Sequence, residues 1–147
     1  MKPIVALILS GTFALAAHAQ DTPPPVLEPV AAETVTLADL MWLKRALVVF
    51  ADSPNDPAYQ AQLEYLAEDP GELIKRDVVI LTDTDPSTLS DIRRKLRPRG
   101  FSLVLLDKDG AVKLRKPLPW RVREITHAID KFPLRRQEIR DQQSARE

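Results

Sequence analysis

The chain has 147 residues, equal numbers of acidic and basic side chains (21 of each) and no cysteine. This length suits one domain with a single hydrophobic core. Without a thiol, the chain has no thiolate nucleophile and no thiolate metal ligand, so cysteine-dependent oxidoreductases and peroxidases are excluded. The charges are unevenly distributed, because residues 20–91 carry four basic and fourteen acidic side chains, whereas residues 92–147 carry sixteen basic and seven acidic ones.

The N-terminus has the pattern of an export signal. Lys2 precedes an apolar stretch over residues 4–17, and Ala17-His18-Ala19 forms a small-residue cleavage site before Gln20. The stretch is too short for a comfortable membrane span. We therefore expect residues 1–19 to be removed, which leaves an exported periplasmic or secreted protein without a transmembrane anchor.

Residues 20–35 contain four prolines and few large apolar side chains. This composition predicts a semi-extended linker, because it cannot bury enough surface to order itself. Thr36 is expected to cap a short turn that contains Leu40 and Trp42. We interpret Trp42 as part of the hydrophobic core or of its edge. The apolar run of residues 46–51 then predicts a first buried strand.

Two Asp-Pro pairs predict helix starts, because a capping aspartate is followed by a proline at a position that needs no N–H. Asp56-Pro57 opens the first helix, which ends before Asp69-Pro70-Gly71, and residues 77–82 form the second strand. Asp85-Pro86 opens the next helix, which ends before Pro98. The apolar faces of the two helices consist of Tyr59, Leu63, Leu66, Leu89, Ile92 and Leu96.

Residues 101–115 predict a β-hairpin. Residues 102–106 form a continuous apolar run, residues 111–115 alternate apolar with basic side chains, and Gly110 supplies the positive φ that a short connection needs. Prolines 117 and 119 precede a last helix, whose apolar face consists of Val122, Ile125, Ile129 and Phe132.

The order strand, helix, strand, helix, strand, strand, helix predicts an α/β fold of thioredoxin-like type. The right-handed βαβ unit joined to the hairpin gives a four-stranded mixed sheet with flanking helices, and residues 102–106 lie in its centre beside residues 46–51. The domain spans residues 36–138, and residues 139–147 form a polar C-terminal tail.

Several pieces of the sequence together resemble domain of unknown function 4174, a peroxiredoxin-related, thioredoxin-like domain of exported bacterial and animal extracellular-matrix proteins. The resemblance extends over residues 37–138 and implies the fold without catalytic cysteines, but no particular activity. Leu134 and Ile139 stand where methionine is expected, and Asp107 where glycine is expected. The pieces are Leu40-x-Trp42-x-x-Arg45 with Leu47-Val48-Val49-Phe50, Arg76-Asp77, Phe101, Lys108-Asp109-Gly110-x-x-Lys113, Ile129-Asp130 and Pro133-x-Arg135-Arg136-x-Glu138.

Both halves of a thioredoxin redox site are missing. The loop after the first strand reads Asp52-Ser53-Pro54-Asn55-Asp56, and no proline stands at Gly100-Phe101 before the third strand. A nucleophilic Ser53 would need a general base, and His127 is the one histidine beyond the predicted cleavage site. We interpret Ser53 as part of a helix-capping loop and His127 as a solvated helix residue.

Four aspartates follow the two parallel strands, at the edge where α/β sites usually lie. Such oxygen ligands suit Ca²⁺ or Mg²⁺, but their spacing matches no dedicated loop, so capping is favoured and neither metal nor cofactor is expected. The alternative function is an enzyme of unassigned chemistry that uses these loops with a bound metal or cofactor. The four residues are Asp52, Asp56, Asp83 and Asp85.

The late basic residues are the candidate binding residues. Charge runs are usually solvated, but here most acids lie earlier in the chain, so a local positive field is expected. Trp120 is a possible contact residue, although core is the favoured interpretation. The set comprises Lys113, Arg115, Arg121, Arg123, Arg135 and Arg136.

The leading prediction is thus a non-catalytic, exported binding or structural module. Its partner would be an anionic polymer, an anionic envelope surface or an acidic protein, and no specific nucleic acid is indicated. The sequence leaves the oligomeric state open.

Overall fold

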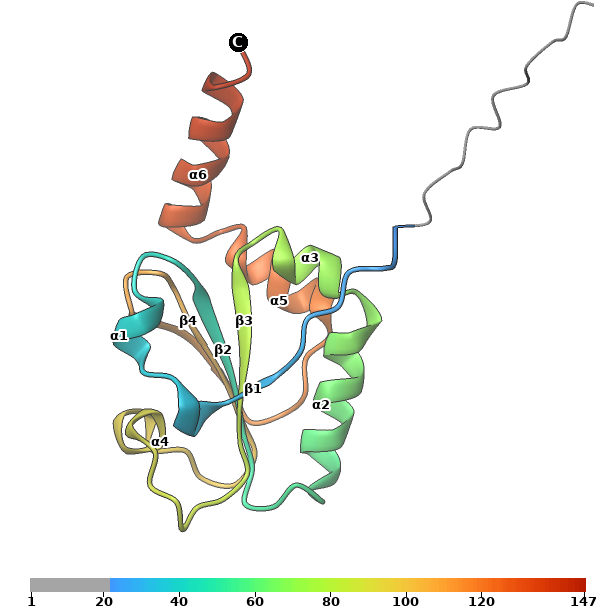
Figure 1. Ribbon diagram of the computed structural model, residues 1–147, viewed down its shortest axis with the longest axis vertical. Helices are drawn as coiled ribbons and strands as arrows, with labels where there is room; N and C mark the ends of the chain where they lie inside the picture. Colours follow the sequence, from blue (N-terminus) through green and yellow to red (C-terminus); the bar gives the residue numbers. More distant parts are fainter. Residues whose placement is uncertain (1–21) are drawn as a thin grey trace, which may run out of the picture.

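A computed structural model describes residues 22–147 (Figure 1). The predicted signal, residues 1–19, lies outside the described residues, so export remains a prediction. The helices are α1 (Leu37–Leu40), α2 (Pro57–Glu68), α3 (Pro70–Ile74), α4 (Asp91–Leu96), α5 (Val122–Ile129) and α6 (Pro133–Ser144), with a 3-10 turn η1 (Ala32–Thr34). The strands are β1 (Val30–Ala31), β2 (Arg45–Phe50), β3 (Val78–Asp83), β4 (Ser102–Leu106) and β5 (Val112–Lys116). None of the helices in this part of the chain is both long and apolar enough to cross a membrane.

The strands form one mixed sheet in the order β1-β3-β2-β4-β5. β2 pairs with β3 in parallel and with β4 in antiparallel orientation, so residues 102–106 lie beside the first long strand, as predicted. β4 and β5 form the predicted hairpin. The thioredoxin-like α/β architecture is confirmed, but the sheet has five strands rather than four.

The extra strand comes from the segment that the sequence predicts to be a linker. Val30 and Ala31 pair in parallel with Leu81 and Thr82 of β3, and Ala32 is buried. A strand of two residues leaves no periodic signal, and the neighbouring prolines hide it further. Residues 30–35 therefore belong to the folded domain.

Two apolar layers cover the two faces of the sheet, because side chains alternate along each strand. Leu47 and Leu105 lie in the layer that packs against α2, α3 and α5, whereas Val48 and Val104 lie in the layer that packs against α1 and α4. Figure 1 shows these two groups of helices on opposite sides of the sheet.

Helix α4 begins later than predicted. Ser90, not Asp85, is its N-cap, and the Ser90 hydroxyl accepts the Arg93 N–H at 3.0 Å. Asp85 instead holds a turn, since its carboxylate accepts the N–H and hydroxyl of Ser87 and the hydroxyl of Thr88. These hydrogen bonds lower the pKa of Asp85 to about 2. Leu89, predicted on the apolar face of the helix, is 56% exposed.

Trp42 does not belong to the core, contrary to the prediction. It is 64% exposed and has a positive φ of 64° in the loop between α1 and β2. The backbone N–H of Trp42 donates to the Lys108 carbonyl oxygen at 2.7 Å, which fixes the loop against the β4–β5 turn. The apolar neighbours of Trp42 in sequence, Met41 and Leu43, are exposed as well.

The polar tail is helical over most of its length. Pro133 begins α6 rather than only interrupting the preceding helix, and α6 continues to Ser144. Figure 1 shows α6 projecting away from the body of the domain. Residues 140–147 are exposed, so this part of α6 buries no apolar face against the sheet.

Candidate functional site

Of the four aspartates at the carboxyl ends of β2 and β3, Asp52 is exposed, whereas Asp56, Asp83 and Asp85 make contacts within the domain. Asp56 caps α2 as predicted, accepting the N–H groups of Ala58 at 2.8 Å and Tyr59 at 3.3 Å. Asp83 is buried, pairs with Arg93 at 2.8 Å and accepts the Ser90 hydroxyl. No group of three or more metal-ligating side chains occurs within residues 22–147.

Ser53, in the loop after β2, accepts the N–H of Asn55 at 3.1 Å. His127 lies on α5 and is exposed, as predicted. The structure therefore gives Ser53 a turn-forming contact in the loop that leads into α2.

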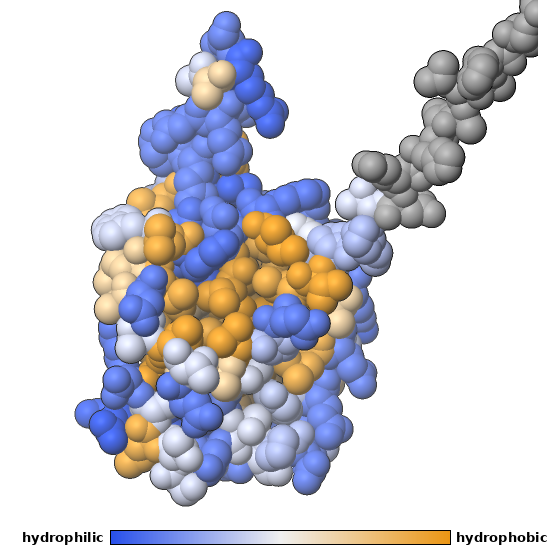
Figure 2. Space-filling model, in the orientation of Figure 1, coloured by the Kyte–Doolittle hydropathy of each residue, from blue (hydrophilic) through white to orange (hydrophobic). Residues whose placement is uncertain are grey.

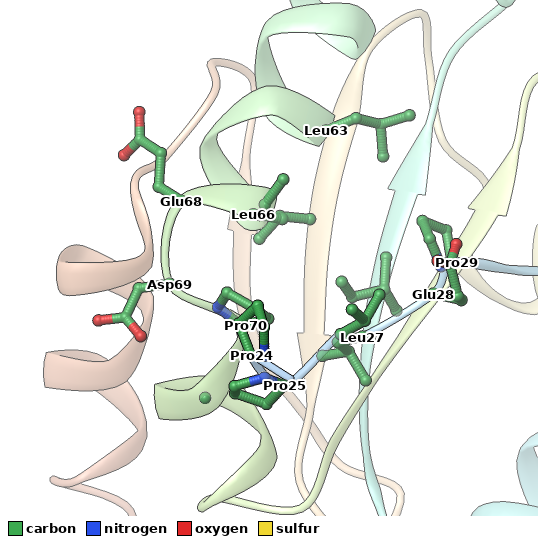
Figure 3. A pocket seen from close by; sticks show the side chains of 14 residues that line it. Pro24, Pro25, Leu27, Glu28, Pro29, Leu63, Leu66, Glu68, Asp69 and Pro70 are labelled. Carbon is green, nitrogen blue, oxygen red and sulfur yellow. The ribbon is translucent and has the colours of Figure 1, made fainter. Parts of the chain in front are cut away.

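A hollow of about 580 Å³ opens beside α2 and α3 (Figure 3). The segment of residues 24–29 forms one wall, and Leu66 and Ile80 form part of the opposite one. Figure 3 shows Glu68 and Asp69 pointing away from Leu66. Figure 2 shows hydrophobic side chains gathered over this face of the molecule. The lining of the hollow is mainly apolar and also includes Glu28, Glu68 and Asp69.

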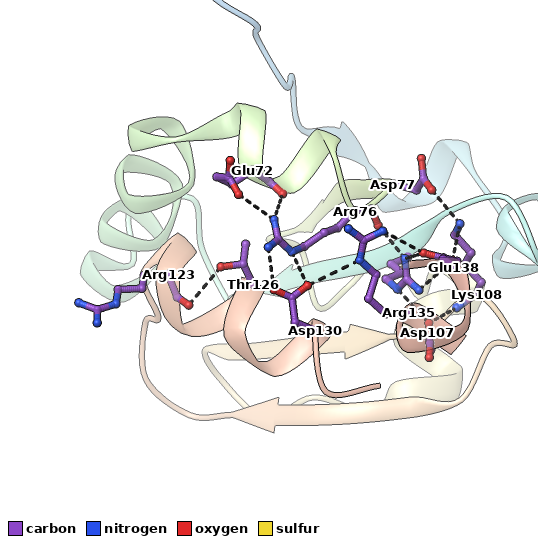
Figure 4. Close-up of polar contacts among 11 residues, drawn as sticks. Glu72, Arg76, Asp77, Asp107, Lys108, Arg123, Thr126, Asp130, Arg135 and Glu138 are labelled. Carbon is purple, nitrogen blue, oxygen red and sulfur yellow. Dashed lines mark hydrogen bonds and ion pairs between the residues drawn. The ribbon is translucent and has the colours of Figure 1, made fainter. Parts of the chain in front are cut away.

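A charged network surrounds Arg45 at the start of β2, at the end of the sheet opposite the carboxyl ends of β2 and β3. Figure 4 shows Asp107, Lys108 and Glu138 of this network close together. The Arg45 side chain is fully buried. Its Nε donates to Asp107 Oδ1 at 2.9 Å, Nη1 donates to the Arg76 carbonyl oxygen at 2.9 Å, and Nη2 donates to Glu138 Oε1 at 3.0 Å. One guanidinium thus joins β2 to the residue after β4, to Arg76 two positions before β3 and to α6.

Glu138 on α6 is surrounded by three cations. Besides Arg45, it pairs with Lys108 at 2.8 Å and with Arg135 at 3.2 Å. Burial alone would raise the pKa of Glu138, but the hydrogen bonds from Lys108, Arg45 and Arg135 outweigh it and lower the pKa to about 2. The carboxylate is therefore ionised at any physiological pH and holds α6 on the domain.

The network continues to α3 and α5. Arg76 donates to both oxygens of Asp130, at 2.8 and 2.7 Å, and to Glu72 at 2.9 Å. The Arg76 hydrogen bond lowers the pKa of Asp130 against an opposing effect of burial. Lys108 also reaches Asp77 at 2.7 Å. The pairs Arg76–Asp130 and Lys108–Asp77 link elements that are distant in sequence, so the network fixes the packing of the domain.

The structure does not gather the six predicted basic residues into one surface. Arg135 is 9% exposed and belongs to the network. Arg121 pairs with Glu68 at 2.6 Å and lies over the Tyr65 ring. The exposed members without an ion pair in the described part of the chain are Lys113, Arg115, Arg123 and Arg136.

Arg115 instead joins three other cations around a hollow of about 370 Å³, which we call the basic hollow. Its residues come from the end of α4, the loop before β4 and the end of β5. Within residues 22–147, none of the four cations has an acidic partner. The lining consists of Arg97, Arg99, Phe101, Ser102, Arg115, Lys116 and Pro117.

Local structure holds the basic hollow in shape. Arg97 ends α4 in a left-handed conformation with φ 47°, and its N–H donates to the Arg93 carbonyl oxygen. Arg115 donates to the Leu96 carbonyl oxygen at 2.8 Å. Lys116 lies 4.5 Å from the centre of the Trp120 ring, which is half-buried. Two of the four cations are therefore oriented by the fold itself.

Sequence reasoning missed Arg97, Arg99 and Lys116. The available signal was Arg97-Pro98-Arg99 directly before the central strand. Its significance depends on the strand order, which brings the start of β4 beside the end of β5.

A family model described as "Domain of unknown function (DUF4174)" matches residues 36–138. The chain belongs to this family. Most charged residues on which the family resemblance was based lie in the network of ion pairs around Arg45, Arg76 and Glu138. These residues are Arg45, Arg76, Asp77, Lys108, Asp130, Arg135 and Glu138.

One relative of this DUF4174 chain is coiled-coil domain-containing protein 80 from Danio rerio, which is 31% identical over 138 residues. The match covers 74% of this chain but spans only 16% of the length of that relative. The relative is thus much larger than the matched region.

Solved structures show the same fold. The match to reduced 2-Cys peroxiredoxin from Plasmodium vivax has a TM-score of 0.54 and 16% identity. It covers 65% of this chain and 81% of the peroxiredoxin chain. The match to chloroplastic thioredoxin z has a TM-score of 0.55 and 19% identity. It covers 75% of this chain and 96% of the thioredoxin z chain. At these identities the likeness concerns the fold alone, and this DUF4174 chain has no cysteine.

Proposed function

We propose that the domain is a non-catalytic binding module that recognises an anionic partner at the basic hollow. The supporting observation is that Arg97, Arg99, Arg115 and Lys116 line one hollow and have no acidic partner in the described part of the chain. We also propose that the module acts after export, on the basis of the N-terminal pattern of residues 2–19.

The physical basis is a local field rather than net charge. The chain has a formal net charge of zero, but an approaching anion responds to charges within about 10 Å at 0.1 M salt. Guanidinium groups bind carboxylate, sulfate and phosphate through paired hydrogen bonds, and concave walls concentrate the field. Four cations around one hollow therefore favour a partner with several negative groups over a single small anion.

The non-catalytic part of the proposal is supported by the carboxylates at the strand ends. Asp83 is paired with Arg93, and Asp56 and Asp85 are hydrogen bonded to backbone and hydroxyl groups of their own loops. Asp83 and Asp85 line a hollow of about 150 Å³, but these contacts occupy their carboxylates, and Asp52 is exposed to solvent. A scaffold that presents a fixed charged surface accounts for the observed contacts.

Chromatography on a sulfated polysaccharide matrix tests the proposal. A hollow variant replaces Arg97, Arg99, Arg115 and Lys116 by Gln, and we expect it to elute at clearly lower salt than the wild-type protein. A surface variant with the same change in charge serves as the matched control. It replaces Lys44, Arg123, Lys131 and Arg136, which are exposed and unpaired within residues 22–147. Equal elution of the two variants would contradict a specific role of the basic hollow.

A further inference from the structure

Strand β5 is the outermost strand of the sheet on the side of the basic hollow. It pairs with β4 along one edge, and within residues 22–147 no strand pairs with its other edge. An edge strand presents backbone N–H and C=O groups that match an added strand. The first requirement for strand addition is therefore met.

The side chains of β5 determine which charge an added strand must carry to bind favourably. Lys113, Arg115 and Lys116 make three of its five residues basic. A second copy pairing edge to edge would place cations opposite cations, which destabilises the pair. An acidic strand would instead place carboxylates beside these cations. The edge therefore disfavours self-pairing and is complementary to an acidic segment.

The edge also leads into the basic hollow. Arg115 and Lys116 belong to both, and Arg97 and Arg99 extend the positive charge beyond the end of the strand. Exposed apolar side chains lie at the first residue of β5, Val112 at 46% exposure, and two residues beyond its end, Leu118 at 68%. A strand lying along β5 would thus find apolar contacts at its ends and cations along its length.

We infer that β5 and the basic hollow together bind an acidic peptide in extended conformation, as a sixth strand of the sheet. This inference rests on the proposed function and names the partner class of the same surface. Leu114 packs toward the core, and Arg115 lies on the opposite face, where it reaches the Leu96 carbonyl oxygen. Because side chains alternate, an acidic residue at every second position of the peptide places its carboxylates on one face of the sheet.

The probe is a peptide of about ten residues that alternates glutamate and valine, long enough to extend past both ends of a typical strand. Its partner probe has the same sequence with N-methylated central amides, which keeps the charge and removes the backbone donors. Binding is measured by fluorescence anisotropy with the full chain. We expect N-methylation to weaken binding by at least about tenfold, since several backbone hydrogen bonds are lost.

Hydrogen exchange provides the second readout. We expect the unmodified peptide to slow exchange of backbone amides within residues 112–116. If the N-methylated peptide binds equally well and these amides exchange unchanged, strand addition is wrong, while anion binding at the hollow still stands. If the hollow variant binds the unmodified peptide as tightly as the surface variant does, the proposed function fails instead.

Discussion

Arg45 and Asp107 form an ion pair with both side chains fully buried, and 2.9 Å separates Arg45 Nε from Asp107 Oδ1. The two residues are 62 positions apart in sequence. Asp107 immediately follows β4, so the pair joins the start of one central strand to the end of its antiparallel neighbour. Removing Asp107 leaves Arg45 buried with the partly exposed Glu138 as its remaining charged partner in the described part of the chain, which gives the pair a strong structural role.

Asp107→Ala should therefore lower the free energy of unfolding by up to about 3 to 5 kcal/mol, because Arg45 remains buried, loses its fully buried partner and keeps only the partly exposed Glu138. Denaturant unfolding measures the change. Asp91→Ala is the control, since Asp91 forms an exposed pair with Arg94 at 3.7 Å and should change stability by less than about 1 kcal/mol. Similar losses in the two variants would contradict the importance of the buried pair.

Stability should fall in acid because of Glu138. Its pKa lies at about 2 in the folded domain, below its ordinary value of 4.5. A carboxyl with a lowered folded pKa contributes its full stabilisation above the unfolded pKa, and this contribution declines as the pH falls from about 4.5 to about 2. The lowered pKa of Asp130 adds to the same trend.

Glu138→Gln tests this assignment, because the variant has no carboxyl to titrate at this position. Its free energy of unfolding should depend less steeply on pH between about 5 and 2 than that of the wild-type protein. Identical slopes for the two proteins would show that other carboxyls cause the acid sensitivity.

Gly110→Val should destabilise the domain by about 1 to 3 kcal/mol, since a β-branched residue is strained at positive φ. The φ of Gly110 is 80°, and an added Cβ would meet Met41 Cε at 3.3 Å. Gly71→Ala is the control, because its φ is not in the left-handed region and an added Cβ would meet Pro25 Cγ at an ordinary 3.4 Å. An unchanged denaturant midpoint for Gly110→Val would contradict the strain at the turn.

Export with cleavage before Gln20 is expected from the Ala17-His18-Ala19 pattern. Intact-mass analysis of periplasmic or secreted protein should give the mass of a chain that begins at Gln20. Recovery of the chain with residues 1–19 in the membrane fraction would contradict removal of the signal.

The sequence predicted those parts of the fold that depend on local patterns. The apolar run of residues 102–106, the alternation after it and Gly110 predicted the hairpin, and Asp56-Pro57 predicted the start of α2. The start of α4 was not predicted. Ser90 caps the helix in place of Asp85, because its hydroxyl accepts the Arg93 N–H and is held by a hydrogen bond to the buried Asp83.

The contacts around Arg45 and the basic hollow depend on tertiary structure, so local patterns could not predict them. Arg45 lies 93 positions from Glu138, and no spacing rule connects two such residues. Arg97 meets Arg115 at the hollow only because β4 and β5 run antiparallel. The charge asymmetry of the sequence led to the hypothesis of an anionic partner, which stays a prediction, and it could not separate Arg135, which is buried, from Arg99, which is exposed.

The central claim is that an anionic partner binds at the basic hollow, and calorimetric titration with a sulfated oligosaccharide at low and moderate salt tests it most directly. The wild-type protein and the surface variant should bind with similar affinity, and higher salt should weaken both. The hollow variant should lose most of the affinity at low salt. Equal affinities of the hollow and surface variants, or no binding by the wild-type protein at low salt, would contradict the claim.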